Sequence, residues 1–180
     1  MKKVVFFDRD DTLIVDHLYL NDPDDIHYLP HAFASLKNLR DYGFDFVIVT
    51  NQSGIARGLV DPRNLREIHR RIRNEYSRIG VDILDFLYAP YLPVTDHFLR
   101  KPHPGMLFEA AKNYRIDLKK SWMVGDRMTD VEAGHRAGTK SILLGHRENP
   151  ADSPYDPPEF HANNLKEVSD FIIDHTKLDP

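Results

Sequence analysis

Two aspartates near the start of the chain have the spacing needed for chemistry on a metal-bound phosphate. Asp8 and Asp10 follow a short apolar run, and residues two apart at an extended strand end point to the same side. Two carboxylates placed in this way repel each other unless a cation lies between them. Mg²⁺ prefers oxygen ligands and keeps coordination positions for water and a phosphate. One carboxylate could then attack phosphorus while the other moves a proton.

Three further segments carry polar residues that would complete such a site. Asp126 offers a third carboxylate, and Asp130 could support it. Thr50 could donate a hydrogen bond to phosphoryl oxygens, and Lys101 would stabilise the negative charge that develops on them. Each residue alone also has an ordinary explanation as a turn, a helix cap or a surface charge. Their order, and their place after successive apolar runs, favours a phosphoryl-transfer site.

The segments that must position these residues alternate between apolar runs and patterns of helical period. Strands are expected at residues 3–8, 44–50, 83–89, 121–124 and 140–144, with a further short strand near 160, and helices at 32–42, 62–79, 104–114, 131–137 and 165–175. This alternation is typical of a parallel sheet covered on both faces, which binds ligands beyond the carboxyl ends of its strands. We therefore predict the α/β class, with a Rossmann-like parallel sheet.

The length of the chain, 180 residues, suits one domain, with a core over residues 3–145 and a loop and helix over 146–180. One loop, one helix and one strand account for the interval from Asp8 to Thr50, and one helix, one strand and one loop account for the interval from Thr50 to Lys101. These intervals leave no room for a cap domain. The site should be open, and a small phosphorylated metabolite fits it.

Composition narrows the classes of partner and the compartment. The net charge of −4 gives no general attraction to nucleic acid, and the absence of cysteine excludes disulfides and thiolate metal sites. No apolar run approaches the roughly 20 residues that cross a bilayer, and the apolar stretch after the basic N-terminus stops at Asp8. We expect a cytoplasmic monomer that binds neither nucleic acid nor membrane.

The motifs, taken in order, carry a family resemblance. Asp8-Arg9-Asp10, Thr50, Lys101 and Gly125-Asp126 with the following Asp130 resemble the four motifs of haloacid dehalogenase-type phosphatases. Residues 50–58 and 100–106 are similar to the branch that contains D-glycero-D-manno-heptose-1,7-bisphosphate 7-phosphatase and histidinol-phosphate phosphatase. The resemblance covers roughly residues 3–145 and implies a haloacid dehalogenase-like fold.

The resemblance also implies a role for each matching position. Asp8 would be the nucleophile and Asp10 the general acid/base. Mg²⁺ would be held by Asp8, the backbone carbonyl of Asp10, and Asp126, with Asp130 in support. The phosphoryl clamps would be Thr50 and Lys101. Substrate contacts would come from Asp16, His17, Tyr19, Asn51, Gln52, Ser53, Arg100 and Arg127.

Several activities are compatible with these motifs. The segment from Asp16 to Tyr19 is similar to the one that contacts the sugar in the heptose enzymes, which favours removal of the 7-phosphate from heptose 1,7-bisphosphate. Histidinol-phosphate hydrolysis is the alternative within the same branch. A polynucleotide 3′-phosphatase is disfavoured by the acidic net charge. A non-catalytic phosphate-binding domain also stays open.

The sequence departs from the family at two places. Asp11 stands where family members usually have glycine, a residue that adopts positive φ without strain. Aspartate tolerates positive φ better than most residues, but it adds a negative charge near the metal. The loop at 89–99 lacks the cysteines with which many relatives bind zinc, so we expect no structural zinc.

Overall fold

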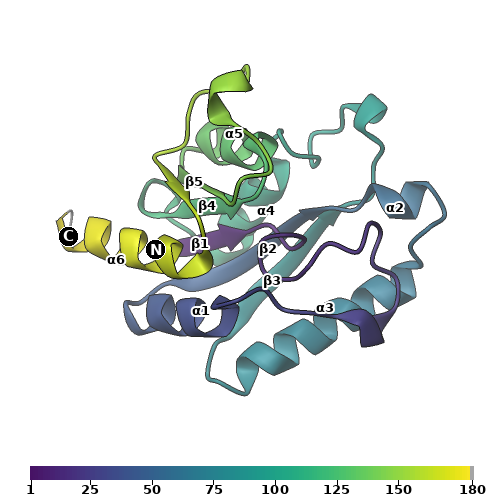
Figure 1. Ribbon diagram of the computed structural model, residues 1–180, viewed down its shortest axis with the longest axis horizontal. Helices are drawn as coiled ribbons and strands as arrows, with labels where there is room; N and C mark the ends of the chain where they lie inside the picture. Colours follow the sequence, from purple (N-terminus) through teal and green to yellow (C-terminus); the bar gives the residue numbers. More distant parts are fainter. Residues whose placement is uncertain (179–180) are drawn as a thin grey trace.

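Six parallel strands form one sheet, whose order is β3-β2-β1-β4-β5-β6 (Figure 1). The structure is a computed structural model, and it describes residues 1–178. The strands are β1 (Val4–Phe7), β2 (Asp45–Asn51), β3 (Ile83–Ala89), β4 (Trp122–Gly125), β5 (Lys140–Leu144) and β6 (Phe160–Ala162). The predicted α/β fold with a Rossmann-like parallel sheet is confirmed.

Helices cover both faces of this sheet. One face carries α1 (Ala32–Asp41), α3 (Pro62–Ser77) and α6 (Leu165–Leu178), and the other carries α4 (Gly105–Tyr114) and α5 (Met128–Ala137). A short helix, α2 (Ser53–Ala56), follows β2, and four single 3₁₀ turns lie in loops, at Pro23–Asp25, Pro93–Thr95, Leu118–Lys120 and Pro150–Asp152. No helix in the described part of the chain is long and apolar enough to cross a bilayer.

The central strand β1 shows why its sequence is an unbroken apolar run. Val5 and Phe7 pack into the cluster beneath α1, α3 and α6, whereas Val4 and Phe6 pack into the cluster beneath α4. Successive side chains of a strand point to opposite faces, so a strand buried on both faces must be apolar at every position.

Local signals set the start of α3 as predicted. The side chain of Asp61 accepts a hydrogen bond from the backbone N–H of Arg63 at 2.7 Å, and Pro62 occupies the first helical position. The start of α5 differs from the sequence prediction by three residues. Glu148 accepts the backbone N–H of Met128 at 2.6 Å, so a residue from a distant loop supports the additional turn.

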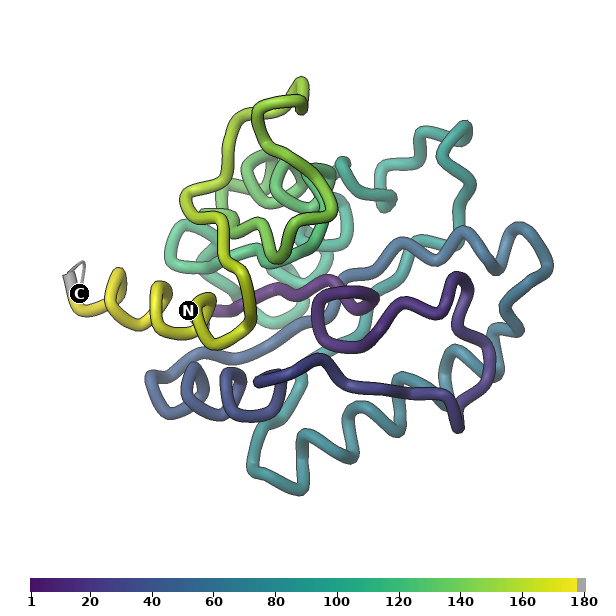
Figure 2. The backbone as a smooth tube through the Cα atoms, in the orientation of Figure 1, coloured from purple at the N-terminus to yellow at the C-terminus, as the bar shows by residue number. Residues whose placement is uncertain are grey.

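The order of the strands places a crevice at the carboxyl ends of β1 and β4. The chain continues from β1 toward β2 and β3 on one side, and from β4 toward β5 and β6 on the other. Ligands bind open α/β sheets where the strand order reverses in this way. The loop between β1 and α1 runs beside α3 (Figure 2), where Arg71 donates a hydrogen bond to the carbonyl of Pro23 at 3.1 Å.

Candidate active site

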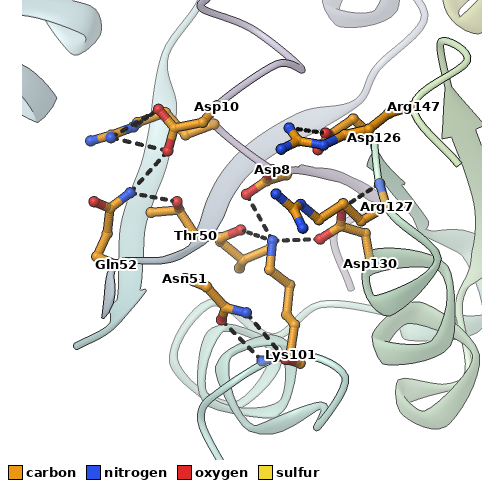
Figure 3. A network of polar contacts seen from close by, with 12 residues as sticks. Asp8, Asp10, Thr50, Asn51, Gln52, Lys101, Asp126, Arg127, Asp130 and Arg147 are labelled. Carbon is orange, nitrogen blue, oxygen red and sulfur yellow. Dashed lines mark hydrogen bonds and ion pairs between the residues drawn. The ribbon is translucent and has the colours of Figure 1, made fainter. Parts of the chain in front are cut away.

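A buried lysine lies at the centre of the crevice. Nζ of Lys101 lies 2.7 Å from Oδ1 of Asp8, 2.6 Å from Oδ1 of Asp130 and 2.8 Å from the carbonyl oxygen of Val49 (Figure 3). Asp8 comes directly after β1, and its backbone N–H donates to the carbonyl of Val124 on β4. The ends of three neighbouring strands therefore meet around one ammonium group.

Burial strongly perturbs the acids of this cluster. Asp8, Asp126 and Asp130 are at most 8% exposed, and Lys101 is 3% exposed. Burial raises the pKa of Asp8 well above its usual range, Lys101 opposes this shift, and the other acids add to it. Burial and then Asp130 raise the pKa of Asp126 to about 6. Burial lowers the pKa of Lys101, but the charges of Asp130 and Asp8 more than offset this and raise it.

These three acids form a site that fits a divalent cation. One carboxylate oxygen from each of Asp8, Asp126 and Asp130 lies within 4.8 Å of the others. Burial is the main cause that raises the pKa of Asp8 and of Asp126, and the neighbouring carboxylates raise both further. An all-oxygen donor set suits Mg²⁺, and the cation would relieve the repulsion.

A second network orients Asp10 and Thr50. Gln52 donates one hydrogen bond to Oδ2 of Asp10 at 3.0 Å and another to Oγ1 of Thr50 at 2.9 Å. Arg9 donates to both carboxylate oxygens of Asp10 at 3.0 Å. A single amide therefore connects the two motif residues, and a guanidinium fixes the carboxylate from the other side.

Arg9 is 1% exposed and contacts His69, which is also buried. Nη1 of Arg9 lies 3.2 Å from Nε2 of His69, which accepts the hydrogen bond as a neutral ring. Burial, followed by the charges of Arg9 and Arg73, lowers the pKa of His69 to about 3. The motif contains Arg9, but nothing in its sequence context indicated that this arginine is buried.

Asn51 supports the lysine through its backbone. Its side chain accepts the backbone N–H of Lys101 at 3.0 Å and donates to the carbonyl of Lys101 at 3.1 Å. These bonds hold the chain just before the cis peptide between Lys101 and Pro102. The amide of Asn51 therefore positions Lys101 at the site.

Gly125 is required by close packing at the end of β4. A Cβ atom at this position would lie 2.2 Å from a carboxylate oxygen of Asp130. That oxygen, Oδ2, also accepts the backbone N–H of Arg127 at 3.1 Å at the start of α5. Glycine at 125 thus allows Asp130 to reach both the helix start and Lys101.

The acids and the lysine line a cavity of about 340 Å³. Thirteen of the fourteen site residues expected from the sequence line it: Asp8, Asp10, Asp16, Tyr19, Thr50, Asn51, Gln52, Ser53, Arg100, Lys101, Asp126, Arg127 and Asp130. The exception, His17, does not line the cavity. Its Nδ1 lies 3.8 Å from Asp25, in an exposed group with His27.

Five arginines also line the cavity: Arg9, Arg57, Arg100, Arg127 and Arg147. Burial lowers the pKa of Arg100, and the charges of Arg127 and Arg57 lower it further. Arg57 belongs to the string at 50–58, so its place in the motif was a signal for it. Arg147 lies in a loop after β5, and sequence reasoning missed it because no local pattern distinguishes it from a surface arginine.

Comparisons with known proteins agree with this geometry. A family model described as HAD-hydrolase-like matches residues 98–168. D-glycero-alpha-D-manno-heptose-1,7-bisphosphate 7-phosphatase of Photorhabdus laumondii is 37% identical over 177 residues, covering 94% of this chain and 96% of the relative. D-glycero-beta-D-manno-heptose-1,7-bisphosphate 7-phosphatase of Helicobacter pylori J99 is 30% identical over 171 residues, covering 94% and 97%.

A solved structure shares the whole fold. The D,D-heptose 1,7-bisphosphate phosphatase from B. bronchiseptica, crystallised with magnesium and phosphate, superposes with a TM-score of 0.87 at 28% identity, covering 96% of this chain and 99% of that one. The sheet order and the buried acid–lysine cluster, together with these relatives, define a haloacid dehalogenase-like phosphatase. Within this superfamily, the chain belongs to the branch of the heptose-1,7-bisphosphate 7-phosphatases.

Proposed function

We propose that this phosphatase removes the 7-phosphate of D-glycero-D-manno-heptose 1,7-bisphosphate through an aspartyl-phosphate formed on Asp8. The observation that carries the proposal is the position of Lys101, whose Nζ joins Asp8 and Asp130 in a cavity lined by five arginines. Such a site offers a nucleophile beside a fixed positive charge, which phosphoryl transfer requires.

In the first step, a carboxylate oxygen of Asp8 attacks phosphorus, and the bond from phosphorus to the sugar oxygen breaks. Oδ1 is engaged by Lys101, so Oδ2 is the oxygen left to attack. Asp10 gives its proton to the leaving sugar oxygen. Lys101 stabilises the negative charge on the phosphoryl oxygens, and Thr50 donates a hydrogen bond to them.

In the second step, water attacks phosphorus, and the bond between phosphorus and Asp8 breaks. Asp10 accepts the proton of the water, so phosphate leaves and both aspartates return to their starting states. Asp8, the backbone carbonyl of Asp10, and Asp126 would hold Mg²⁺, with Asp130 in support. When bound, Mg²⁺ supplies positive charge against the transferring phosphoryl group.

Two observations support a sugar bisphosphate as the substrate. Arg57, Arg100 and Arg127 line the cavity, so positive charge is available for a second phosphate outside the acid–lysine cluster. The relatives from P. laumondii and H. pylori are named for the α and β anomers of heptose 1,7-bisphosphate, respectively. The anomer used by this chain is therefore part of the test.

The experiment measures phosphate release from both anomers of heptose 1,7-bisphosphate, from histidinol phosphate and from a 3′-phosphorylated oligonucleotide, with Mg²⁺ present. We expect a heptose bisphosphate to have the highest kcat/KM. Higher values for histidinol phosphate or the oligonucleotide would overturn the substrate assignment. Asp8→Asn should lower kcat by about 10³ or more, because the covalent route is lost.

Asp45→Asn is the matched control for Asp8→Asn. Asp45 begins β2 and pairs with Lys2 on the surface, so the same loss of one carboxylate leaves the cavity unchanged. This variant should keep wild-type kcat. If Asp8→Asn and Asp45→Asn both retained near-wild-type kcat, Asp8 would not be the nucleophile.

A further inference from the structure

Asp11, the residue that departs from the family motif, has a partner far away in the sequence. Nη1 of Arg147 donates a hydrogen bond to Oδ2 of Asp11 at 2.8 Å. The same nitrogen lies 3.1 Å from Oδ2 of Asp126 (Figure 3) and 3.8 Å from Oδ2 of Asp16. One guanidinium nitrogen is therefore shared by three carboxylates beside the cavity.

The backbone at position 11 keeps the conformation that glycine would adopt. Asp11 has φ of 51°, in the left-handed region. Its side chain adds contacts that glycine could not make, because Oδ1 accepts the backbone N–H of Asp16 at 2.9 Å while Oδ2 binds Arg147. Asp11 thus joins the start of the cavity-lining segment at 16–20 to the loop after β5.

The other end of this connection is also anchored. Arg147 precedes Glu148, whose carboxylate accepts the backbone N–H of Met128 at the start of α5. Met128 lies two residues after Asp126, so the loop that carries Arg147 is attached next to the expected metal ligand. The ion pair therefore links the loops that follow β1 and β5 across the end of β4.

We propose that Arg147 is a positioning residue of the active site, and that Asp11 and Arg147 act as a compensating pair. This inference rests on the proposed phosphatase function. Asp11 adds a negative charge beside a site that must admit a phosphate dianion. Arg147 cancels that charge, and Asp11 in turn holds the guanidinium against the acids at the cavity wall. Loss of Arg147 would leave Asp11 repelling the incoming phosphate.

The proposal makes the effect of removing Arg147 depend on Asp11. Arg147→Gln leaves three acids without their shared cation, whereas Asp11→Asn/Arg147→Gln removes the added charge as well. Asparagine keeps an oxygen to accept the backbone N–H of Asp16, so the double variant preserves that loop contact. A purely structural role for Arg147 predicts that the double variant is at least as impaired as the single one.

The test measures KM and kcat with heptose 1,7-bisphosphate, and the Kd of inorganic phosphate with Mg²⁺ by calorimetry. At low salt, Arg147→Gln should raise both KM and Kd about tenfold, with a smaller effect on kcat, and the increase should shrink at high salt. Asp11→Asn/Arg147→Gln should return both to within about twofold of the wild type. Arg147→Lys, which keeps the charge, should lie close to the wild type.

The matched control is Arg136→Gln. Arg136 and Arg147 both have side chains that are 39% exposed, but Arg136 pairs with Glu132 on α5 and does not line the cavity. This variant should leave KM and Kd unchanged. Thermal unfolding of every variant checks folding, and Arg147→Lys and the double variant still test the pair if Arg147→Gln does not fold.

Two results would overturn the proposal that Asp11 and Arg147 form a compensating pair. If KM and Kd of Arg147→Gln stayed within twofold of the wild type, the charge of Asp11 would need no compensation. If KM and Kd of the double variant were raised as much as those of Arg147→Gln, Arg147 would contact the ligand without acting through Asp11. If the wild type hydrolysed no phosphate ester but the variants changed the Kd of phosphate as expected, the proposed function would be wrong and the compensating pair would be supported. If the wild type bound no phosphate, both would fall.

Discussion

Replacement of Lys101 by methionine would remove a buried charge while nearly preserving the shape of the side chain. The ammonium group contacts Asp8, Asp130 and the carbonyl of Val49, and its side chain is 2% exposed. Methionine keeps the apolar stem within the same packing. The change in the free energy of unfolding therefore reports mainly on the electrostatics of the cluster.

Removal of one partner from a buried ion pair costs about 3–5 kcal/mol, because the remaining charge has no compensation. The raised pKa of Asp8 moderates this loss, since its carboxyl group can take up a proton. We therefore expect Lys101→Met to lower the free energy of unfolding by about 3 kcal/mol, at the lower end of this range, in metal-free protein at pH 7. Asp8→Asn/Lys101→Met should be more stable than Lys101→Met, because one of the uncompensated carboxylates is gone.

Urea unfolding in EDTA measures these differences. Lys166→Met is the control, because Lys166 pairs with Asp170 on the surface of α6, where solvent screens the pair and its loss should change the free energy of unfolding much less. The reasoning would be refuted if Lys101→Met lost less than about 1 kcal/mol, or if the double variant were less stable than Lys101→Met.

Two other properties follow from the buried charges. Burial, with Arg9 and Arg73, lowers the pKa of His69 from 6.5 to about 3, so between these values the unfolded chain binds a proton that the folded protein does not, and acidification destabilises the fold. Between pH 7 and pH 5, the free energy of unfolding in urea should fall by about 2 kcal/mol more for the wild type than for His69→Gln. Equal decreases in the two proteins would contradict a neutral His69. Mg²⁺ at 100 times its Kd should stabilise metal-free protein by about 2.7 kcal/mol, measured by denaturant unfolding with and without EDTA. Asp126→Asn should lose most of this gain and Asp170→Asn none; an unchanged gain in Asp126→Asn would remove Asp126 from the proposed metal site.

Much of the fold could be predicted because the sheet is buried on both faces. A strand in such a sheet must be apolar throughout, so Val4–Phe7 and its neighbours were visible as short apolar runs. Helix α3 carried its cap and its buried stripe in local sequence. The start of α5 was predicted three residues late, since its first turn depends on Glu148 from another loop.

Most of the predicted site residues do meet at the cavity, and the reason is topological. Parallel strands end at one edge of the sheet, so polar residues after successive strands converge there. His17 was grouped with its neighbours by resemblance to a segment, but the backbone turns at Leu18 and Tyr19, which both have positive φ. His17 consequently lies next to Asp25, away from the cavity.

The sequence by itself determined the type of fold and the residue types of the site, because apolar periodicity and strand-end motifs are local. Contacts between distant loops were decided only by the tertiary structure. Asp11 could be recognised as a charge in the place of glycine, and its tolerance of positive φ could be expected. Its partner Arg147 could not, because only the order of the strands brings the loops after β1 and β5 together, where a guanidinium and three carboxylates share one corner of the site.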